Sequence, residues 1–423
     1  MQSLAAALLT STAHASRLLT GLVLVKVIAV YLGPEGMGRL GHFMNVVTIL
    51  SMLAGGGILN GVMKYVAEYR QNPQELLGFV SGASSYALIA SMLIMIMGIL
   101  FSEQISLVIF ATSEYAVFIC IAFSAQACFA FSNLVNGVAN GLGRQRVFAI
   151  IQILGNLLAI PIIWGLVHYY GFRGAAIAII AASSLYFFPA FYFFYRSSFW
   201  GKIVISFKDF KYFRQLLSFT AILIASVVSF PVIEIVVREM IIRGGGYDQA
   251  GIWQASIRLS GAYLGFFGVF LVYYFMPLVS PEQDRALIAK HVMKHALAIG
   301  GVFLVGAVSF YAGRTYFIPM VLSEGFSELY ALIQFQLIGD FFKILSWVIG
   351  VVGVAKASVR LCVSAEIFQN GTFFLISSLL YSQRQSVESI LFAHIITYII
   401  YFGICCVILA YYVRMGTRIP AHR

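Results

Sequence analysis

Long apolar stretches recur along the whole sequence and determine the kind of fold that it can adopt. Of the 423 residues, 61% are hydrophobic and only 10% are charged. A helix needs about 20 mostly apolar residues to cross a hydrocarbon core of about 30 Å. Twelve stretches meet that length, at roughly 4–32, 37–66, 77–101, 115–142, 147–170, 174–195, 212–242, 249–278, 291–313, 326–355, 360–381 and 388–413. They are continuously apolar rather than alternating, which excludes a transmembrane barrel. We therefore predict an all-α integral membrane protein with twelve transmembrane helices.

The basic residues are distributed unevenly between the connections of these predicted helices. With the N-terminus in the cytoplasm, the even-numbered connections and the C-terminal tail hold sixteen of the 27 lysines and arginines, and the odd-numbered connections hold five. An excess of Lys and Arg in cytoplasmic loops is the positive-inside rule. The net charge of +11 is therefore a sign of membrane topology, with both termini cytoplasmic, and predicts no nucleic-acid partner.

The longest connection, Tyr195 to Gln215, divides the twelve helices into six and six. It mixes aromatic residues with lysines and arginines, which is typical of a segment on the cytoplasmic membrane surface, although a plain basic linker would look the same. We expect an N-terminal lobe at 1–195, an interfacial linker at 196–215 and a C-terminal lobe at 216–423.

The two halves share short sequence matches. "GRQRVFAIIQILGN" ends at Asn156 and "AKASVRLCVSAEIFQN" ends at Asn370, an offset of 214, while "GPEGMGRLGHF" and "GGGYDQAGIWQ" align Gly38 with Gly251, an offset of 213. Parallel repeats of this kind are common in transporters and place the substrate site between the halves. We predict two six-helix lobes around a central cavity.

Several charged residues lie inside the predicted helices, where a charge costs several kcal/mol unless it is paired or faces water. Asp340 and Lys343 are three residues apart, and Glu234 and Arg238 are four apart, so each pair shares one helix face. Such residues are candidates for function. The alternative is that each pair neutralises itself on a face buried against a neighbouring helix.

Other interior charges have no opposite charge within one turn of their own helix. Arg17 lies near the middle of the first predicted helix, and Arg258 and Glu366 lie inside the eighth and eleventh. Lys26 is nearer a helix end and can extend its amine to the membrane surface. Interior cations in two lobes predict a water-filled cavity of positive potential. An anionic substrate would balance that charge, and guanidinium groups bind phosphate with two hydrogen bonds.

The sequence gives no sign of catalysis or of a cofactor. The five cysteines all fall within predicted helices, and no spacing typical of a metal site occurs. A membrane glycan polymerase would need a sizeable outer loop with clustered acids and bases, whereas the outer loops here are short. We predict a transporter and not an enzyme, with no catalytic residues, metal or cofactor.

Several segments resemble one known family. "GPEGMGRLGHF", "GGGILNGVMKYVAEYRQNP", "GIWQASIRLSGAYL" and above all "FQLIGDFFKILSWVIGVVGVAKASVRLCVSAEIFQ" are similar to the Wzx-type polysaccharide flippases, which act on lipid-linked O-antigen or enterobacterial common antigen units, and in appearance most to the common antigen branch. The resemblance does not decide between the two substrates. This family is part of the multidrug/oligosaccharidyl-lipid/polysaccharide (MOP) exporter superfamily, which includes the MATE transporters. The resemblance implies a flippase that moves undecaprenyl-diphosphate-linked oligosaccharide from the cytoplasmic to the periplasmic leaflet of the bacterial inner membrane by alternating access.

The resemblance also assigns residues. The positions that match the family pattern are Lys26, Lys64, Arg238, Asp340, Lys343, Lys356, Arg360 and Glu366, with Arg17 at a basic position. Arg258 departs from the pattern, in which a small polar residue stands at this position. We predict that Arg17, Lys26, Arg238, Arg258 and Lys343 bind the diphosphate and glycan, and that Asp340, Glu366 and Glu234 serve ion coupling or gating.

Two alternatives remain. A multidrug or organic-cation exporter of the same superfamily would have unpaired acids and aromatic residues in its cavity, whereas the unpaired interior groups here are mostly cations. A membrane glycan polymerase is the less favoured alternative. Besides the lipid-linked oligosaccharide and membrane lipid, the resemblance implies a polymerase and a chain-length regulator as partners of the flippase.

Overall fold

The protein is a bundle of long helices in the part of the chain that the computed structural model describes, residues 2–205, 210–226, 229–356 and 359–416. The first half holds α1 (Gln2–Leu53), α2 (Leu59–Tyr69), α3 (Pro73–Leu100), α4 (Ser102–Phe110), α5 (Ala116–Gly141), α6 (Gln145–Ser184) and α7 (Phe187–Tyr195). The second half holds α8 (Phe210–Ser226), α9 (Ser229–Phe270), α10 (Met276–Val279), α11 (Arg285–Ala312), α12 (Arg314–Val321), α13 (Leu329–Ala355), α14 (Val359–Arg384) and α15 (Val387–Gly416). Short 3-10 turns occur at Ala54–Gly56, Ser113–Tyr115 and Glu324–Phe326, and a π-helical turn at Leu271–Phe275.

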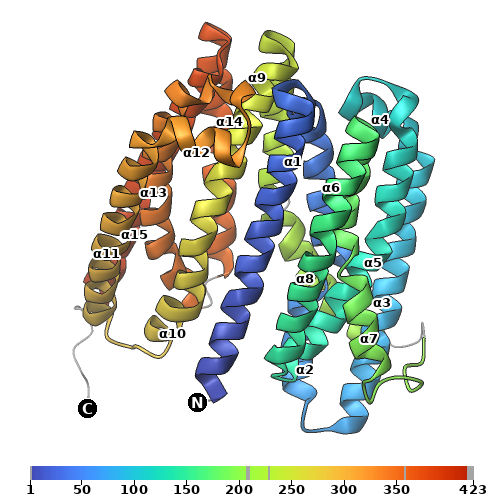
Figure 1. The fold of residues 1–423 in the computed structure, drawn as a ribbon. Coiled ribbons are helices and arrows are strands. Elements are labelled where there is room, and N and C mark those ends of the chain that lie inside the picture. The colour runs from blue at the N-terminus through green and yellow to red at the C-terminus, as the bar shows by residue number, and fades with distance from the viewer. Residues whose placement is uncertain (1, 206–209, 227–228, 357–358, 417–423) are drawn as a thin grey trace. The chain divides into compact units, whose positions relative to one another are not determined.

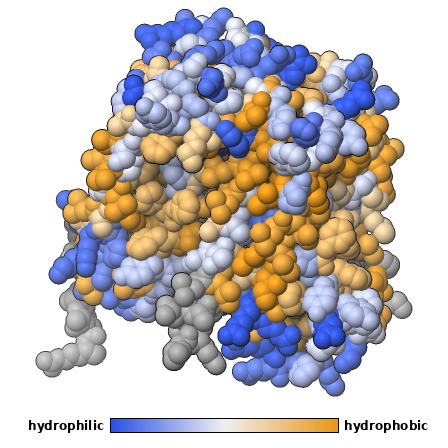
Figure 2. Space-filling view, in the orientation of Figure 1, coloured by the Kyte–Doolittle hydropathy of each residue, from blue (hydrophilic) through white to orange (hydrophobic). Residues whose placement is uncertain are grey.

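Eight helical segments within the described residues are long and apolar enough to cross a membrane. Three of them, Ser11–Tyr69, Gln145–Tyr195 and Ser229–Val279, have 51 to 59 residues. The second contains two of the predicted transmembrane helices, and the other two each contain one predicted helix and the later part of the one before it. Figure 2 shows apolar side chains over the middle of the helices and hydrophilic ones gathered toward their ends. The all-helical membrane fold is confirmed, and the helices are consistent with the twelve predicted.

Glycines in the left-handed region divide these long segments at the predicted boundaries. Gly33 has φ 63° within α1, Gly171 has φ 54° within α6, and Gly246 has φ 80° within α9. Residues with a Cβ rarely adopt such φ values, so glycine allows the chain to leave one helix and begin the next.

The positions of these breaks support the predicted repeat. Gly33 and Gly246 are 213 residues apart (246 − 33), and Gly171 and Gln385, which has φ 46° between α14 and α15, are 214 apart (385 − 171). Both values agree with the offsets in the sequence. In each half, a short helix and a 3-10 turn also precede the fourth transmembrane helix. Helix α4 and the turn Ser113–Tyr115 precede α5, and helix α12 and the turn Glu324–Phe326 precede α13.

Contacts within the chain define two compact units. The N-terminal unit comprises the chain up to Leu32 and Arg39–Ile235, and the C-terminal unit comprises Gly33–Gly38 and the chain from Val236 onward. Part of the predicted linker, 206–209, lies outside the described residues. The lobe boundaries at 195 and 216 therefore stay a prediction.

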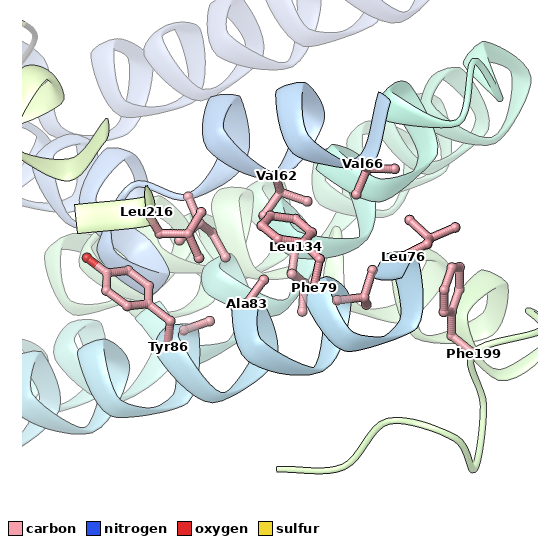
Figure 3. Close-up of a cluster of buried hydrophobic side chains, with 12 residues drawn as sticks. Val62, Val66, Leu76, Phe79, Ala83, Tyr86, Leu134, Phe199 and Leu216 are labelled. Atoms are coloured by element: carbon pink, nitrogen blue, oxygen red, sulfur yellow. The ribbon is translucent and has the colours of Figure 1, made fainter. Parts of the chain in front are cut away.

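The N-terminal unit has an aromatic and aliphatic core between α2, α3, α5 and α8, drawn in Figure 3. Helices α3, α5 and α6 run side by side in this unit (Figure 1). Helix α5 approaches α2 closely at two glycines. A Cβ on Gly137 would lie 2.9 Å from Val62, and one on Gly141 would lie 2.7 Å from Val66, so the absence of side chains there permits the approach. Phe199, from the predicted linker, belongs to the same core.

The C-terminal unit is held together mainly by α13, which packs against α11, α14 and α15. Its core includes Phe275, Ile288, Ile344 and Val348, all fully buried. The segments that matched in the sequence also meet in this unit: a Cβ on Gly38 would lie 2.0 Å from the Tyr247 carbonyl oxygen. A Cβ on Gly251 would lie 1.8 Å from the Pro34 carbonyl oxygen. Only glycine at both positions permits this approach of two backbones.

Candidate functional site

The C-terminal unit contains a buried carboxylate surrounded by hydrogen-bond donors. Asp340, in the middle of α13, has no exposed surface. Tyr263 on α9 donates its hydroxyl hydrogen to Oδ2 of Asp340, and Nε2 of Gln336, one turn earlier on α13, lies 3.1 Å from each carboxylate oxygen. A buried charge is tolerated only where its lone pairs are satisfied, and these donors satisfy them.

His394 on α15 completes this arrangement from a third helix. Its Nε2 atom lies 2.9 Å from Oδ1 of Asp340. The side chain fits because Gly339 lacks a Cβ, which would lie 2.2 Å from Cδ2 of His394. Ser256 on α9 donates to Oε1 of Gln336 at 3.0 Å and so fixes the amide orientation. We call Ser256, Tyr263, Gln336, Asp340 and His394 the Asp340 cluster.

Lys343 lies one turn beyond Asp340 and is partly buried among aromatic rings. Its Nζ atom is 5.2 Å from the centre of the Tyr398 ring and 5.7 Å from that of Trp347. Rings at this distance attract a cation through their negative faces. The Tyr398 hydroxyl accepts a hydrogen bond of 2.9 Å from Nε2 of Gln369 on α14. Lys343, its neighbours and the Asp340 cluster therefore involve four helices, α9, α13, α14 and α15.

The N-terminal unit contains a second buried polar group, centred on Asn156 of α6. Nδ2 of Asn156 donates to Oγ of Ser16 at 2.9 Å, and its Oδ1 accepts from the hydroxyl of Tyr186 at 2.7 Å. The Thr20 hydroxyl donates to the Ser16 carbonyl at 3.0 Å and lies 3.5 Å from the carbonyl oxygen of Asn156. We call Ser16, Thr20, Asn156 and Tyr186 the Asn156 cluster. It connects α1 and α6 by side chains that carry no charge.

Arg17 lies directly beside the Asn156 cluster, between Ser16 and Thr20 on α1. Its side chain is exposed, whereas Thr20 is buried. Arg17 is close enough to His14 and Tyr186 to interact electrostatically with both. An exposed guanidinium on a helix that two hydroxyl residues fasten to its neighbour is well placed to meet an anion.

The structure places the other predicted site residues in varied surroundings. Lys26 and Arg258 are partly buried, Glu234 is buried, and Glu366 is exposed. Arg238 is fully buried, donates from Nη2 to Oε1 of Gln254, and lies 5.5 Å from the ring centre of Trp253. The assignment of all eight residues to substrate binding, coupling or gating stays a prediction.

The sequence interpretation did not single out His394, Tyr263, Gln336 or Tyr186. Neutral amides, hydroxyls and an isolated histidine on an apolar helix give no charge signal. Asn156 had appeared only as a repeat match. The glycine directly before Asp340, and the glycine directly before Asn156, are the signals that could have indicated a bulky neighbour at each position.

Comparisons with known proteins agree with this description. The family model described as "Polysaccharide biosynthesis protein" matches residues 3–281, more than half of the chain. The chain therefore belongs to the polysaccharide biosynthesis protein family. It is 29% identical over 405 residues to the Lipid III flippase of Escherichia coli (strain K12), covering 95% of this chain and 96% of that protein. The Lipid III flippase of Shigella flexneri matches to the same extent.

Solved structures show the same fold. A MATE multidrug resistance transporter of the MOP superfamily in an inward-facing conformation has a TM-score of 0.73 at 15% identity, over 94% of this chain and 96% of that one. The lipid II flippase MurJ in an inward closed conformation also has a TM-score of 0.73 at 15% identity, over 98% of this chain and 91% of that one. The predicted MATE-like fold is confirmed.

Proposed function

We propose that this protein is a flippase that moves undecaprenyl-diphosphate-linked oligosaccharide from the cytoplasmic to the periplasmic leaflet of a bacterial inner membrane. The observation that carries the proposal is the match to Lipid III flippases along 95% of the chain, which leaves no large segment of either protein unmatched. The protein moves its substrate and does not alter it chemically, so it is a transporter and not an enzyme.

The interior cations support an anionic substrate. Arg17 is exposed beside the Asn156 cluster, and Lys343 lies among aromatic rings beside the Asp340 cluster. In our proposal Arg17, Lys26, Arg238, Arg258 and Lys343 bind the diphosphate and glycan in turn as access alternates between the two sides. Moving a diphosphate outward across an inside-negative membrane is favoured by about 2.3 kcal/mol per charge per 100 mV.

The surroundings of Asp340 suit a gating role. The partners of Asp340 come from α9, α13 and α15, so a movement of α9 relative to α13 would separate Tyr263 from the carboxylate. We assign gating or ion coupling to Asp340, Glu366 and Glu234. Unchanged transport after collapse of the proton gradient would exclude proton coupling.

The orientation and partners complete the proposal. Both termini face the cytoplasm, because that orientation places most lysines and arginines on the inner side. A polymerase and a chain-length regulator, whose substrate the flippase would deliver, are the proposed protein partners. Whether the cargo is an O-antigen unit or an enterobacterial common antigen unit is decided by its sugars.

A deletion strain tests the proposal. Mass spectrometry of undecaprenyl-linked glycans should detect one complete repeat unit that accumulates in the cytoplasmic leaflet and disappears when the wild-type gene is restored. Arg17→Ala and Asp340→Ala at normal protein levels should fail to clear it. If nothing accumulates and the surface glycan is intact, the flippase proposal is wrong, and a drug or organic-cation exporter becomes the better explanation of a MATE-like fold.

A further inference from the structure

Arg17 is an exposed cation of the N-terminal unit, and Ser16, next to it on α1, is hydrogen-bonded to another helix. Ser16, immediately before it, accepts a hydrogen bond from Asn156 of α6, and the Thr20 hydroxyl, three residues after it, donates to the Ser16 carbonyl at 3.0 Å and lies 3.5 Å from the Asn156 carbonyl oxygen. The side of α1 next to Arg17 is therefore held mainly by the hydrogen bond between Ser16 and Asn156. This contact determines how the helix presents the guanidinium.

Asn156 can fasten α1 only if its amide has one particular orientation. The amide nitrogen must point to Ser16, because Oγ of Ser16 already donates to the Ala13 carbonyl at 2.8 Å and needs a donor in return. Tyr186 imposes this orientation by donating its hydroxyl to Oδ1 of Asn156 at 2.7 Å. With the oxygen held by Tyr186, the nitrogen can only face α1.

The chain makes specific room for Tyr186. Gly155, which directly precedes Asn156, lies against the tyrosine ring, where a Cβ would be 2.3 Å from Cδ1. Any other residue at this position would push the ring away from Asn156. Asn156 has only 1% of its surface exposed, so no solvent replaces the lost bonds.

We infer that Asn156 and Tyr186 are positioning residues that hold Arg17 in the orientation that binds the diphosphate group of the substrate. This inference rests on the proposed function, because it takes Arg17 as a ligand of the diphosphate. Tyr186 fixes the amide orientation of Asn156, and Asn156 then contacts Ser16 and Thr20 and so holds α1. The position of α1 in turn sets the orientation of Arg17. None of the positioning residues carries a charge, so their effect on the anion passes through Arg17.

Binding of farnesyl diphosphate, a short prenyl diphosphate, to the purified full-length protein in detergent tests the inference. Tyr186→Phe keeps the ring and removes the hydroxyl, and we expect it to weaken binding about three- to tenfold, the effect of one buried hydrogen bond. Ser16→Ala should weaken binding by a smaller factor in the same direction. The matched control is Tyr86→Phe, which removes a hydroxyl contact of 2.8 Å with Thr220 in the same unit and should leave affinity unchanged.

A double-mutant cycle separates positioning from a merely structural role. If Tyr186 acts through Arg17, then Tyr186→Phe has no further effect on affinity once Arg17 is replaced by Gln. An equal loss in both backgrounds would overturn the inference, and so would wild-type affinity in Tyr186→Phe. Those results leave the proposed function intact as long as Arg17→Gln itself weakens binding. If Arg17→Gln binds normally and the deletion strain accumulates no lipid-linked glycan, the proposed function fails instead.

Discussion

The N-terminal and C-terminal units hold a buried polar residue in the same local way but with different chemistry. In each unit a glycine directly precedes that residue, Gly155 before Asn156 and Gly339 before Asp340, and makes room for a ring that contacts it. The ring is Tyr186 in one unit and His394 in the other. The glycines are 184 residues apart (339 − 155), which is not the repeat offset, so the arrangement occurs at non-equivalent positions of the repeat.

The difference lies in what the buried group can do. The Asn156 cluster consists of an amide and hydroxyls, and it connects two helices beside an exposed cation. The Asp340 cluster contains a carboxylate and an imidazole, with partners on three helices. We propose that the N-terminal unit presents a charge in a fixed orientation, and that the partners of the buried charge in the C-terminal unit change during transport.

The largest expected difference between the clusters comes from deleting the buried charge. Asp340→Ala should destabilise the protein by about 3–5 kcal/mol, since it leaves Tyr263, Gln336 and His394 without their common acceptor. Transport should be lost as well. Thermal unfolding in detergent measures the stability, and the exposed Asp248→Ala is the control. Near-normal stability of Asp340→Ala would contradict the description of this cluster.

The two arginines sharpen the comparison. Arg238→Met should lower the free energy of unfolding by about 2–3 kcal/mol, because it removes a buried charge-assisted hydrogen bond to Gln254. Arg17→Met changes an exposed side chain and should alter stability by no more than about 0.5 kcal/mol, yet abolish clearance of the lipid-linked unit. Thermal unfolding measures both variants. Equal destabilisation by Arg238→Met and Arg17→Met would contradict the claim that the buried arginine stabilises the fold and the exposed one does not.

The paired glycines test the shared local arrangement. Gly339→Ala and Gly155→Ala should each cost about 1–2 kcal/mol, because the new methyl group would collide with His394 or Tyr186. Gly350→Ala on α13 and Gly165→Ala on α6 are matched controls, since nothing lies within 4 Å of a Cβ there. These controls should be neutral or slightly stabilising in the same unfolding measurement. Identical behaviour of all four variants would refute the packing argument.

Removing one serine hydroxyl from each cluster gives the smallest expected change in stability. Ser256→Ala in the Asp340 cluster and Ser16→Ala in the Asn156 cluster each remove one side-chain hydrogen bond and should cost about 1 kcal/mol in unfolding free energy. Transport should separate them, because only Ser16 lies beside Arg17. We expect Ser16→Ala to weaken transport mainly at low substrate concentration, whereas Ser256→Ala, which acts through Asp340, should lower the rate equally at low and at saturating concentration.

The sequence predicted the fold well because hydrophobic length and charge distribution depend on local composition. The apolar stretches ended where Gly33, Gly171 and Gly246 break the helices. The partners within each site could not be predicted in the same way. His394 is 54 residues from Asp340, and Tyr186 is 30 residues from Asn156, so only the packing of helices brings them together. Tyr186 and Ser16 carry no charge, so the pattern of charged residues gave no sign of them.

Flipping by the purified protein tests the central proposal most directly. Proteoliposomes would carry undecaprenyl-diphosphate-linked oligosaccharide in both leaflets, and a membrane-impermeant oxidant of vicinal diols would report the glycan that reaches the outside. We predict that the wild-type protein makes the inner-leaflet glycan accessible, while Arg17→Gln and Asp340→Ala leave it protected. If the wild-type protein exposes no more glycan than protein-free vesicles, or if both variants flip at the wild-type rate, the account is contradicted.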